Sequence, residues 1–173
     1  MSPPITGHFI MRLGLSIFAG LLALGSATTA FAYDDPKALV DAIYAPYLSG
    51  GTQPDLTQFY SAHLRELFTV HEQGGRIEPA SIDDREPAPP IDFNPFIDAK
   101  HSLLFDLKVG EPMVLGKSAL VPVSFHNFDQ PTLLSLALVK EDDGWKVDDV
   151  TSTGGEANWM LSWLLLYDPW AVH

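Results

Sequence analysis

The chain has 173 residues and carries 22 acidic against ten basic side chains, a formal net charge of −12 at pH 7. A surface this acidic repels nucleic-acid phosphates and anionic lipid headgroups, so we expect no nucleic-acid partner. The sequence contains no cysteine, which excludes a disulfide framework and a lipid-modified cysteine anchor.

The first 32 residues are predicted to be a secretory signal peptide. Arg12 precedes an apolar run from Leu13 to Leu24, and small residues then lead to Ala30-Phe31-Ala32. A charge, an apolar run and a small-residue site in this order indicate cleavage after Ala32. The run has about a dozen residues, short of the roughly 20 that span a bilayer, so we expect no stable membrane insertion after cleavage.

The mature chain, residues 33–173, is expected to be a single periplasmic or secreted domain. It has 141 residues and keeps nine basic and all 22 acidic side chains, which gives a net charge of −13. Met11 directly precedes Arg12 and is a more natural start for a signal peptide than Met1, although the sequence leaves both starts open.

Two amphipathic helices are expected at the start of the mature chain. Asp34 or Asp35 can cap the first, and Pro36 stands in its first turn, where a missing N–H costs nothing. The second is expected from about Asp55, its cap, to Gln73, before the stop signal Gly74-Gly75. Its stripe at helical spacing is Leu56, Phe59, Tyr60, His63, Leu64, Leu67, Phe68 and His71.

A meander of strands is predicted after a proline-rich acidic loop, which has one short helical turn near Pro95 to His101. From Leu103 the apolar period changes from 3.6 to 2, which predicts strands over 103–109, 113–115 and 118–127. The stretch 132–141 is apolar on both faces and is therefore expected to be central. A hairpin turn leads into the last strand, Trp145 to Val150.

Helices followed by an antiparallel meander are typical of an α+β fold, with N-terminal helices packed on a curved antiparallel sheet. The order of parts resembles exported bacterial proteins of unknown function that have a nuclear transport factor 2-like cone, a cystatin-like α+β fold. The resemblance covers about residues 44 to 150, and Asn94 stands where the family has an acidic residue. The residues that carry it form a D-F-x-P-F loop and a W-K-V-D-D-V strand: Asp92, Phe93, Pro95, Phe96, Trp145, Asp148 and Asp149.

This resemblance implies a strongly bent sheet wrapped around helices, with a pocket between them. It implies no activity, because that fold hosts enzymes, binding modules and docking domains alike.

The adjacent aspartates of the last strand are the first candidate for chemistry. Side chains alternate along a strand, so Asp148 and Asp149 are expected on opposite faces and cannot form a pair. Asp149 should share a face with Trp145 and Val147, where burial would raise its pKa and suit a general base. We favour the alternative that Asp149 ties a loop or a helix N-terminus by hydrogen bonds.

Histidines and the acidic loop are weaker candidates. His63 and His71 are about 12 Å apart along their helix, too far for one metal ion. His63 and His126 remain possible acid–base groups, with a core-edge position favoured. No metal site is expected, because the loop lacks calcium-binding spacing across its acidic residues, Asp83, Asp84, Glu86, Asp92 and Asp98. Asp92, Phe93 and Phe96 in this loop are candidate ligand or partner contacts, although we favour the alternative that the two phenylalanines plug the open end of the sheet.

The C-terminal segment gives the best partner signal. Trp159, Met160, Trp163, Leu164 and Tyr167 form one helical stripe, and Leu161, Leu165 and Leu166 make the other side apolar too. We expect the first stripe, with Trp159 and Trp163, to pack against the core or to contact a partner. Packing of the helix in the core is the favoured interpretation. The functional alternative is that the second side is covered by another chain, either a second copy or a different protein.

No catalytic motif or cofactor signature is present in the sequence, so no catalytic activity and no cofactor are assigned. We interpret the chain as an exported binding or interaction module, more simply a non-enzyme than an enzyme. One alternative is a periplasmic immunity or inhibitor protein whose acidic surface neutralises a basic toxin or hydrolase. Another is a small-molecule enzyme with a pocket aspartate base, Asp149, and a histidine.

Overall fold

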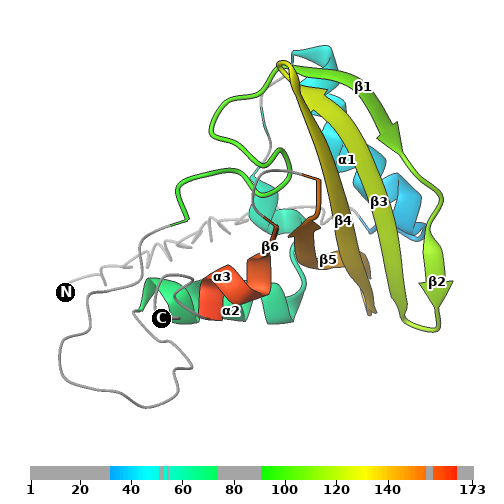
Figure 1. Cartoon of the computed structure of the whole chain (residues 1–173). Helices are drawn as coiled ribbons and strands as arrows, with labels where there is room; N and C mark the ends of the chain where they lie inside the picture. The colour runs from blue at the N-terminus through cyan, green and yellow to red at the C-terminus, as the bar shows by residue number, and fades with distance from the viewer. Residues whose placement is uncertain (1–31, 51–52, 54, 74–90, 155–157, 167–173) are drawn as a thin grey trace, which may run out of the picture.

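An antiparallel sheet carries most of the architecture, and helices lie against it (Figure 1). The computed structural model describes residues 32–50, 53, 55–73, 91–154 and 158–166. The predicted signal peptide up to residue 31, the stop signal Gly74-Gly75, three loop acids and Tyr167 therefore lie outside the described residues. Those loop acids are Asp83, Asp84 and Glu86.

Helix α1 (Pro36–Ser49) begins where the sequence predicts. The Asp35 carboxylate caps it by accepting the Ala38 amide at 2.8 Å, and Pro36 occupies the first turn. Gly50 ends the helix in the left-handed conformation that glycine adopts without strain. The apolar side of α1 lies in the core, with Leu39, Val40, Ile43 and Tyr44 buried.

The second predicted helix is two elements. A 3-10 helix, η1 (Leu56–Phe59), is followed by a break at Tyr60 and Ser61, and α2 (Ala62–Glu72) then begins with Ser61 as its cap. The break arises because the Ser61 amide donates to the Val147 carbonyl at 2.8 Å, so this segment pairs with a strand. The prediction of one continuous helix was wrong, since periodicity does not reveal a pairing with a distant strand.

The sheet has six strands in the order β1-β3-β4-β5-β6, with β2 also paired to β3. The strands are β1 (Leu104–Val109), β2 (Met113–Leu115), β3 (Ser118–Asn127), β4 (Gln130–Glu141), β5 (Gly144–Ser152) and β6 (Trp159–Met160). β4 lies between β3 and β5, which confirms the prediction of a central strand at 132–141. The α+β class with an antiparallel sheet is likewise confirmed.

A β-bulge in β5 changes which residues face the core. Leu138 pairs with Val147 and Ala137 pairs with Asp149, so Asp148 is the extra residue in the bulge. Val147 and Val150 are both buried, although three positions apart. Asp149 therefore lies on the face opposite to Trp145 and Val147, and the prediction that it shares their face was wrong.

The sequence predicted that the strand ending at Val150 is the last one, but β5 (144–152) is followed by a sixth strand. β6 pairs antiparallel with its end, Thr151 opposite Met160 and Ser152 opposite Trp159. β6 leads directly into the short helix α3 (Leu161–Leu166), which lies beside α2 (Figure 1). The C-terminal segment is thus part strand and part helix.

Candidate functional site

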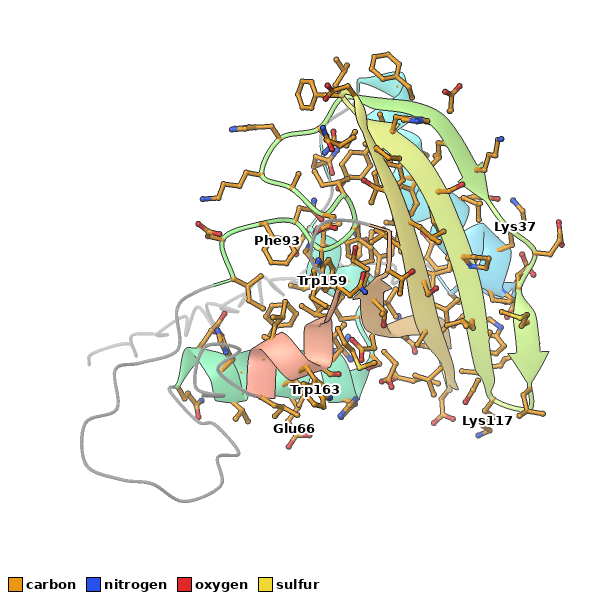
Figure 2. All side chains as sticks on the ribbon, in the orientation of Figure 1. Lys37, Glu66, Phe93, Lys117, Trp159 and Trp163 are labelled. Atoms are coloured by element: carbon orange, nitrogen blue, oxygen red, sulfur yellow. The ribbon has the colours of Figure 1, made fainter. Side chains whose placement is uncertain are left out.

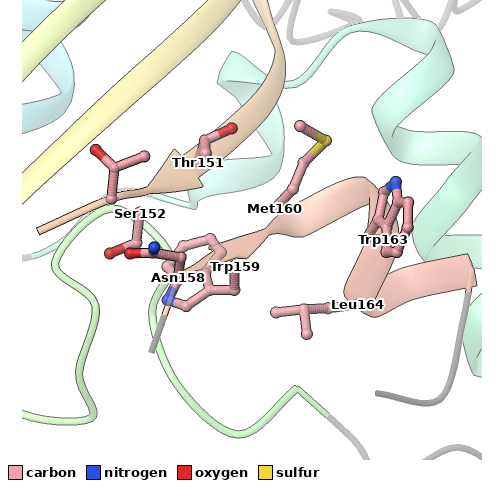
Figure 3. Close-up of a pocket in the computed structure, with 8 residues that line it drawn as sticks. Thr151, Ser152, Asn158, Trp159, Met160, Trp163 and Leu164 are labelled. Carbon is pink, nitrogen blue, oxygen red and sulfur yellow. The ribbon is translucent and has the colours of Figure 1, made fainter. Parts of the chain in front are cut away.

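An apolar cavity of about 300 Å³ lies where the end of β5 meets β6 and α3 (Figure 3). Its walls combine two indole rings and two aliphatic side chains with small polar groups of β5. The lining residues are Thr151, Ser152, Thr153, Asn158, Trp159, Met160, Trp163 and Leu164. A cavity of this size and composition accepts an apolar group such as a side chain or a small ligand.

Trp159 is fixed in the wall of this cavity by two contacts. Its indole N–H donates to Asp98 Oδ1 at 2.7 Å, and its ring meets that of Phe93 edge to face at 5.2 Å. The other oxygen of Asp98 accepts a hydrogen bond from Ser152 Oγ at 2.7 Å. The Asp98 carboxylate thus connects β5, β6 and the 91–101 loop, and it fixes the position of the cavity wall.

Helix α3 is anchored by the side that we expected to meet a second chain. Leu161 and Leu165 are completely buried in the core of this chain. On the opposite side Met160 and Trp163 are 40% and 64% exposed. The partner side that we expected at Leu161 and Leu165 is therefore core, and the more exposed residues of the segment, Met160 and Trp163, are on the cavity side.

Two polar contacts complete the anchoring of α3. The Asp149 carboxylate accepts the amide N–H of Ser162 at 3.0 Å and its hydroxyl at 2.6 Å. The ring of His71 on α2 lies with Nδ1 3.1 Å from the carbonyl of Leu165, which can accept its N–H. Asp149 is therefore found in the alternative role considered for it, tying a helix N-terminus by hydrogen bonds.

The histidine candidates lie elsewhere. His63 is exposed on α2, and its Nδ1 lies 3.3 Å from Asp148, which also accepts the Ser61 hydroxyl at 2.6 Å. The prediction that His63 belongs to the apolar stripe was wrong: it lies in the first turn of α2 with its side chain exposed, whereas Leu64 and Leu67 are buried. Its partner Asp148 occupies the bulge of β5 rather than the lining of the cavity at Trp159.

His126 lies on the outer face of β3, with Nδ1 3.6 Å from the Asp106 carboxylate. It pairs with Pro131, whereas Asp149 pairs with Ala137 six residues further along β4, a separation of about 20 Å at the usual rise per residue. The structure therefore does not bring Asp149 and His126 together in one site.

The loop candidates divide between the surface and the core. Asp92 is exposed and ion-paired with Lys100. Phe93 packs on Trp159 and so supports the cavity. Phe96 is completely buried, and its carbonyl accepts the hydroxyl of Tyr44 at 2.8 Å, so it is a core residue instead of a partner contact.

Buried tyrosines surround Phe96. The ring of Tyr60 lies 6.2 Å from that of Phe96. Burial, and then the negative charge of Asp55, raises the pKa of Tyr60 to about 12. Burial also raises the pKa of Tyr44 well above its ordinary value. These hydroxyls stay neutral at physiological pH, and both tyrosines are part of the core.

Several residues of the cavity were not predicted from the sequence. Asp98 was considered only as part of an acidic loop, whereas its carboxylate orders the cavity wall. Thr151 and Ser152 directly follow the W-K-V-D-D-V stretch. These small polar residues were the available signal that the strand continues. Within the described ranges no three histidine or acidic side chains gather as a metal site would require, and no helix is long and apolar enough to cross a membrane.

No protein-family model and no curated protein matches the chain. Solved structures that resemble it include the native type VI effector–immunity complex Tae3–Tai3 from Ralstonia pickettii, at 19% identity and a TM-score of 0.44, over 72% of this chain and 98% of that one. The selenomethionine form of that complex resembles it at 21% identity and a TM-score of 0.45, over 71% of this chain and 100% of that one. A TM-score below 0.5 does not establish a shared fold, so these two likenesses assign no role to any residue of this chain.

Proposed function

We propose that this protein is an exported protein-binding module of the inhibitor or immunity type, which binds a basic partner at the cavity between β5, β6 and α3. The observation that carries the proposal is the pairing of an apolar cavity with exposed Trp163 and Met160 at its rim. Tryptophan and methionine are enriched in protein interfaces, where an aromatic residue and its pocket supply most of the affinity.

Charge supports a basic partner. The chain has a net charge of −12, and Glu66 and Glu72 are exposed on α2, the helix packed beside α3. Figure 2 shows Glu66 and Trp163 on the same lower side of the molecule. A surface of one sign accelerates association with a partner of the other sign and disfavours like-charged proteins. An apolar cavity beside acidic side chains therefore fits a cationic protein that presents an apolar residue.

The enzyme alternative receives no such support. Both oxygens of Asp149 are engaged with Ser162, and the cavity is not lined by Asp149 or by a histidine. A general base needs an oxygen free to reach the substrate. Inhibition by binding is the function that these contacts favour.

The test uses the purified product of the gene adjacent to the one that encodes this chain. Calorimetry should show binding to the wild-type chain. Met160→Lys places a cation at the rim of the cavity and should weaken binding at least tenfold. The matched control is Met113→Lys on β2, where Met113 is 60% exposed and outside the cavity, and should leave affinity unchanged.

Equal weakening by both methionine variants would contradict the placement of the site. Absence of binding to the wild-type chain would contradict the inhibitor proposal for that gene pair.

We also propose export by cleavage after Ala32 and a nuclear transport factor 2-like cone as the finer description of the fold. Tyr33 has core contacts: its carbonyl accepts the Trp145 amide at 2.8 Å, and its ring lies 6.2 Å from that of Phe59. This supports a mature chain that keeps Tyr33. The bulges in β1 and β5 support a bent sheet. Intact-mass measurement of the exported protein should give a chain starting at Tyr33, and a retained apolar run would contradict the export proposal.

A further inference from the structure

Phe128 occupies a backbone conformation that bulky residues rarely adopt. It is the first residue of a two-residue turn closed by the pair Asn127 and Gln130, and its φ is 56°. Glycine or asparagine is preferred at such a position, because a side chain at positive φ meets the backbone. A phenylalanine there costs stability, so packing of its ring should compensate for the cost if the role is structural.

Packing gives little compensation, because Phe128 is 51% exposed. Its amide donates to the Leu103 carbonyl at 2.9 Å, which ties the turn to β1, the edge strand of the sheet. Leu103 and Phe105 at this edge are 48% and 50% exposed. A strained aromatic residue thus projects from an apolar edge. Exposed apolar groups that gather in this way mark interaction sites.

The turn lies beside the loop that carries Asp98. Phe128, Asp129 and Asp98 line one hollow of about 410 Å³. Asp98 also bonds Ser152 and Trp159, which line the first cavity. Asp98 therefore lines one hollow and orders the wall of the other, so the loop around Asp98 connects the two sites.

Charge indicates the chemistry of that partner. Asp129, next to Phe128, is exposed, and Lys100 in the wall of the same hollow is ion-paired with Asp92. An aromatic ring followed by a carboxylate fits an apolar depression with cationic side chains at its rim. A second copy of this acidic chain would instead bring like charges together.

We propose that Phe128 is an anchor that inserts into an apolar, cation-rimmed cleft of the basic protein partner. This inference rests on the proposed function, because it adds a second contact to the same binding face. A phenylalanine is kept at this strained position because its ring contributes to binding rather than to the core.

Substitution of Phe128 separates binding from stability. Phe128→Gly and Phe128→Asn relieve the strain, so the melting temperature should stay unchanged or rise, while affinity for the purified neighbouring gene product should fall at least tenfold. Asparagine serves as the control for chain flexibility, since it accepts positive φ without the freedom of glycine. A fall in melting temperature with unchanged affinity would show that Phe128 is a structural residue and overturn the proposal.

Photo-crosslinking identifies what contacts the ring. Benzoylphenylalanine at position 128 in whole cells should give an adduct with one basic protein, the same one whose affinity falls in Phe128→Gly. Benzoylphenylalanine at Leu115, which is 85% exposed on β2, is the control and should not give this adduct. An adduct with a second copy of this chain, with lipid, or with nothing would overturn the proposal. If Met160→Lys weakens binding and Phe128→Gly does not, the anchor fails while the proposed function stands.

Discussion

Asp149 on β5 holds Ser162 on α3 through both of its carboxylate oxygens, at 3.0 Å to the amide nitrogen and 2.6 Å to the hydroxyl. Oδ1 also accepts the amide of Val150 at 2.8 Å. This one side chain therefore fixes how α3 sits on the sheet, and α3 in turn carries Trp163 at the rim of the cavity. A change at Asp149 should act on the shape of the binding face through α3.

Asp149→Ala should lower the free energy of unfolding by roughly 1.5–3 kcal/mol, because charge-assisted hydrogen bonds are lost and the Ser162 groups lose their partner. Urea denaturation followed by tryptophan fluorescence measures the change. The control is Asp142→Ala in the β4–β5 turn, where the aspartate is exposed and little change is expected. Equal stability of the two variants would show that the bonds to Ser162 contribute nothing.

Leu165→Ala should destabilise the fold by about 2–5 kcal/mol, because Leu165 is completely buried and the substitution leaves a cavity. Charged residues at Leu161 and Leu165 should prevent folding instead of releasing a soluble monomer. Met160→Ala is the matched change on the exposed side and should alter stability by about 0.5 kcal/mol or less. Thermal unfolding checks both, and a folded, soluble charged double variant would restore the view that this side meets another chain.

Gly144→Ala should destabilise more than Gly116→Ala. Both glycines have positive φ, 112° and 61°, but a Cβ at Gly144 would lie 2.8 Å from the backbone nitrogen and carbonyl oxygen of Tyr33, whereas Gly116 has nothing within 4 Å. Gly116→Ala therefore measures backbone strain alone, about 1–2 kcal/mol. Chemical denaturation of both variants gives the excess at Gly144, and equal losses would mean that Tyr33 does not occupy this place.

Stability should fall at alkaline pH because of Tyr60. Its folded-state pKa is raised from 10.0 to about 12, so the folded chain keeps a proton that the unfolded chain loses. The stabilisation is complete below pH 10 and is lost as pH rises toward 12, at about 1.4 kcal/mol per pH unit.

Denaturation between pH 9 and 11.5 measures this slope, to which Tyr44 also contributes because its pKa is raised by burial. Tyr60→Phe should make the slope shallower, since one titrating group is removed. An identical slope in the variant would show that Tyr60 is not protected from ionisation.

Local patterns in the sequence determined much of the fold. The cap Asp35 and Pro36 set the start of α1, and the change of period after residue 103 identified the strands. Apolar residues on both faces of 132–141 favoured a central strand. β4 does lie between β3 and β5, although only its face with Leu134, Leu136 and Leu138 is buried. These features depend on residues close in sequence, so periodicity and caps reveal them.

Contacts between distant residues decided the rest. The Ser61 amide pairs with Val147, which breaks the second helix, and the bulge at Asp148 moves Asp149 to the other face. Segment 159–166 is apolar nearly all round, so its sequence favours no side. The hydrogen bonds of Asp149 to Ser162 and of Asp98 to Trp159 determine which side of this segment faces the core. The sequence by itself determined α1 and the strands after residue 103, whereas contacts between distant residues determined the division of the second helix, the strand β6 and the binding face, because each such contact joins residues that no local period relates.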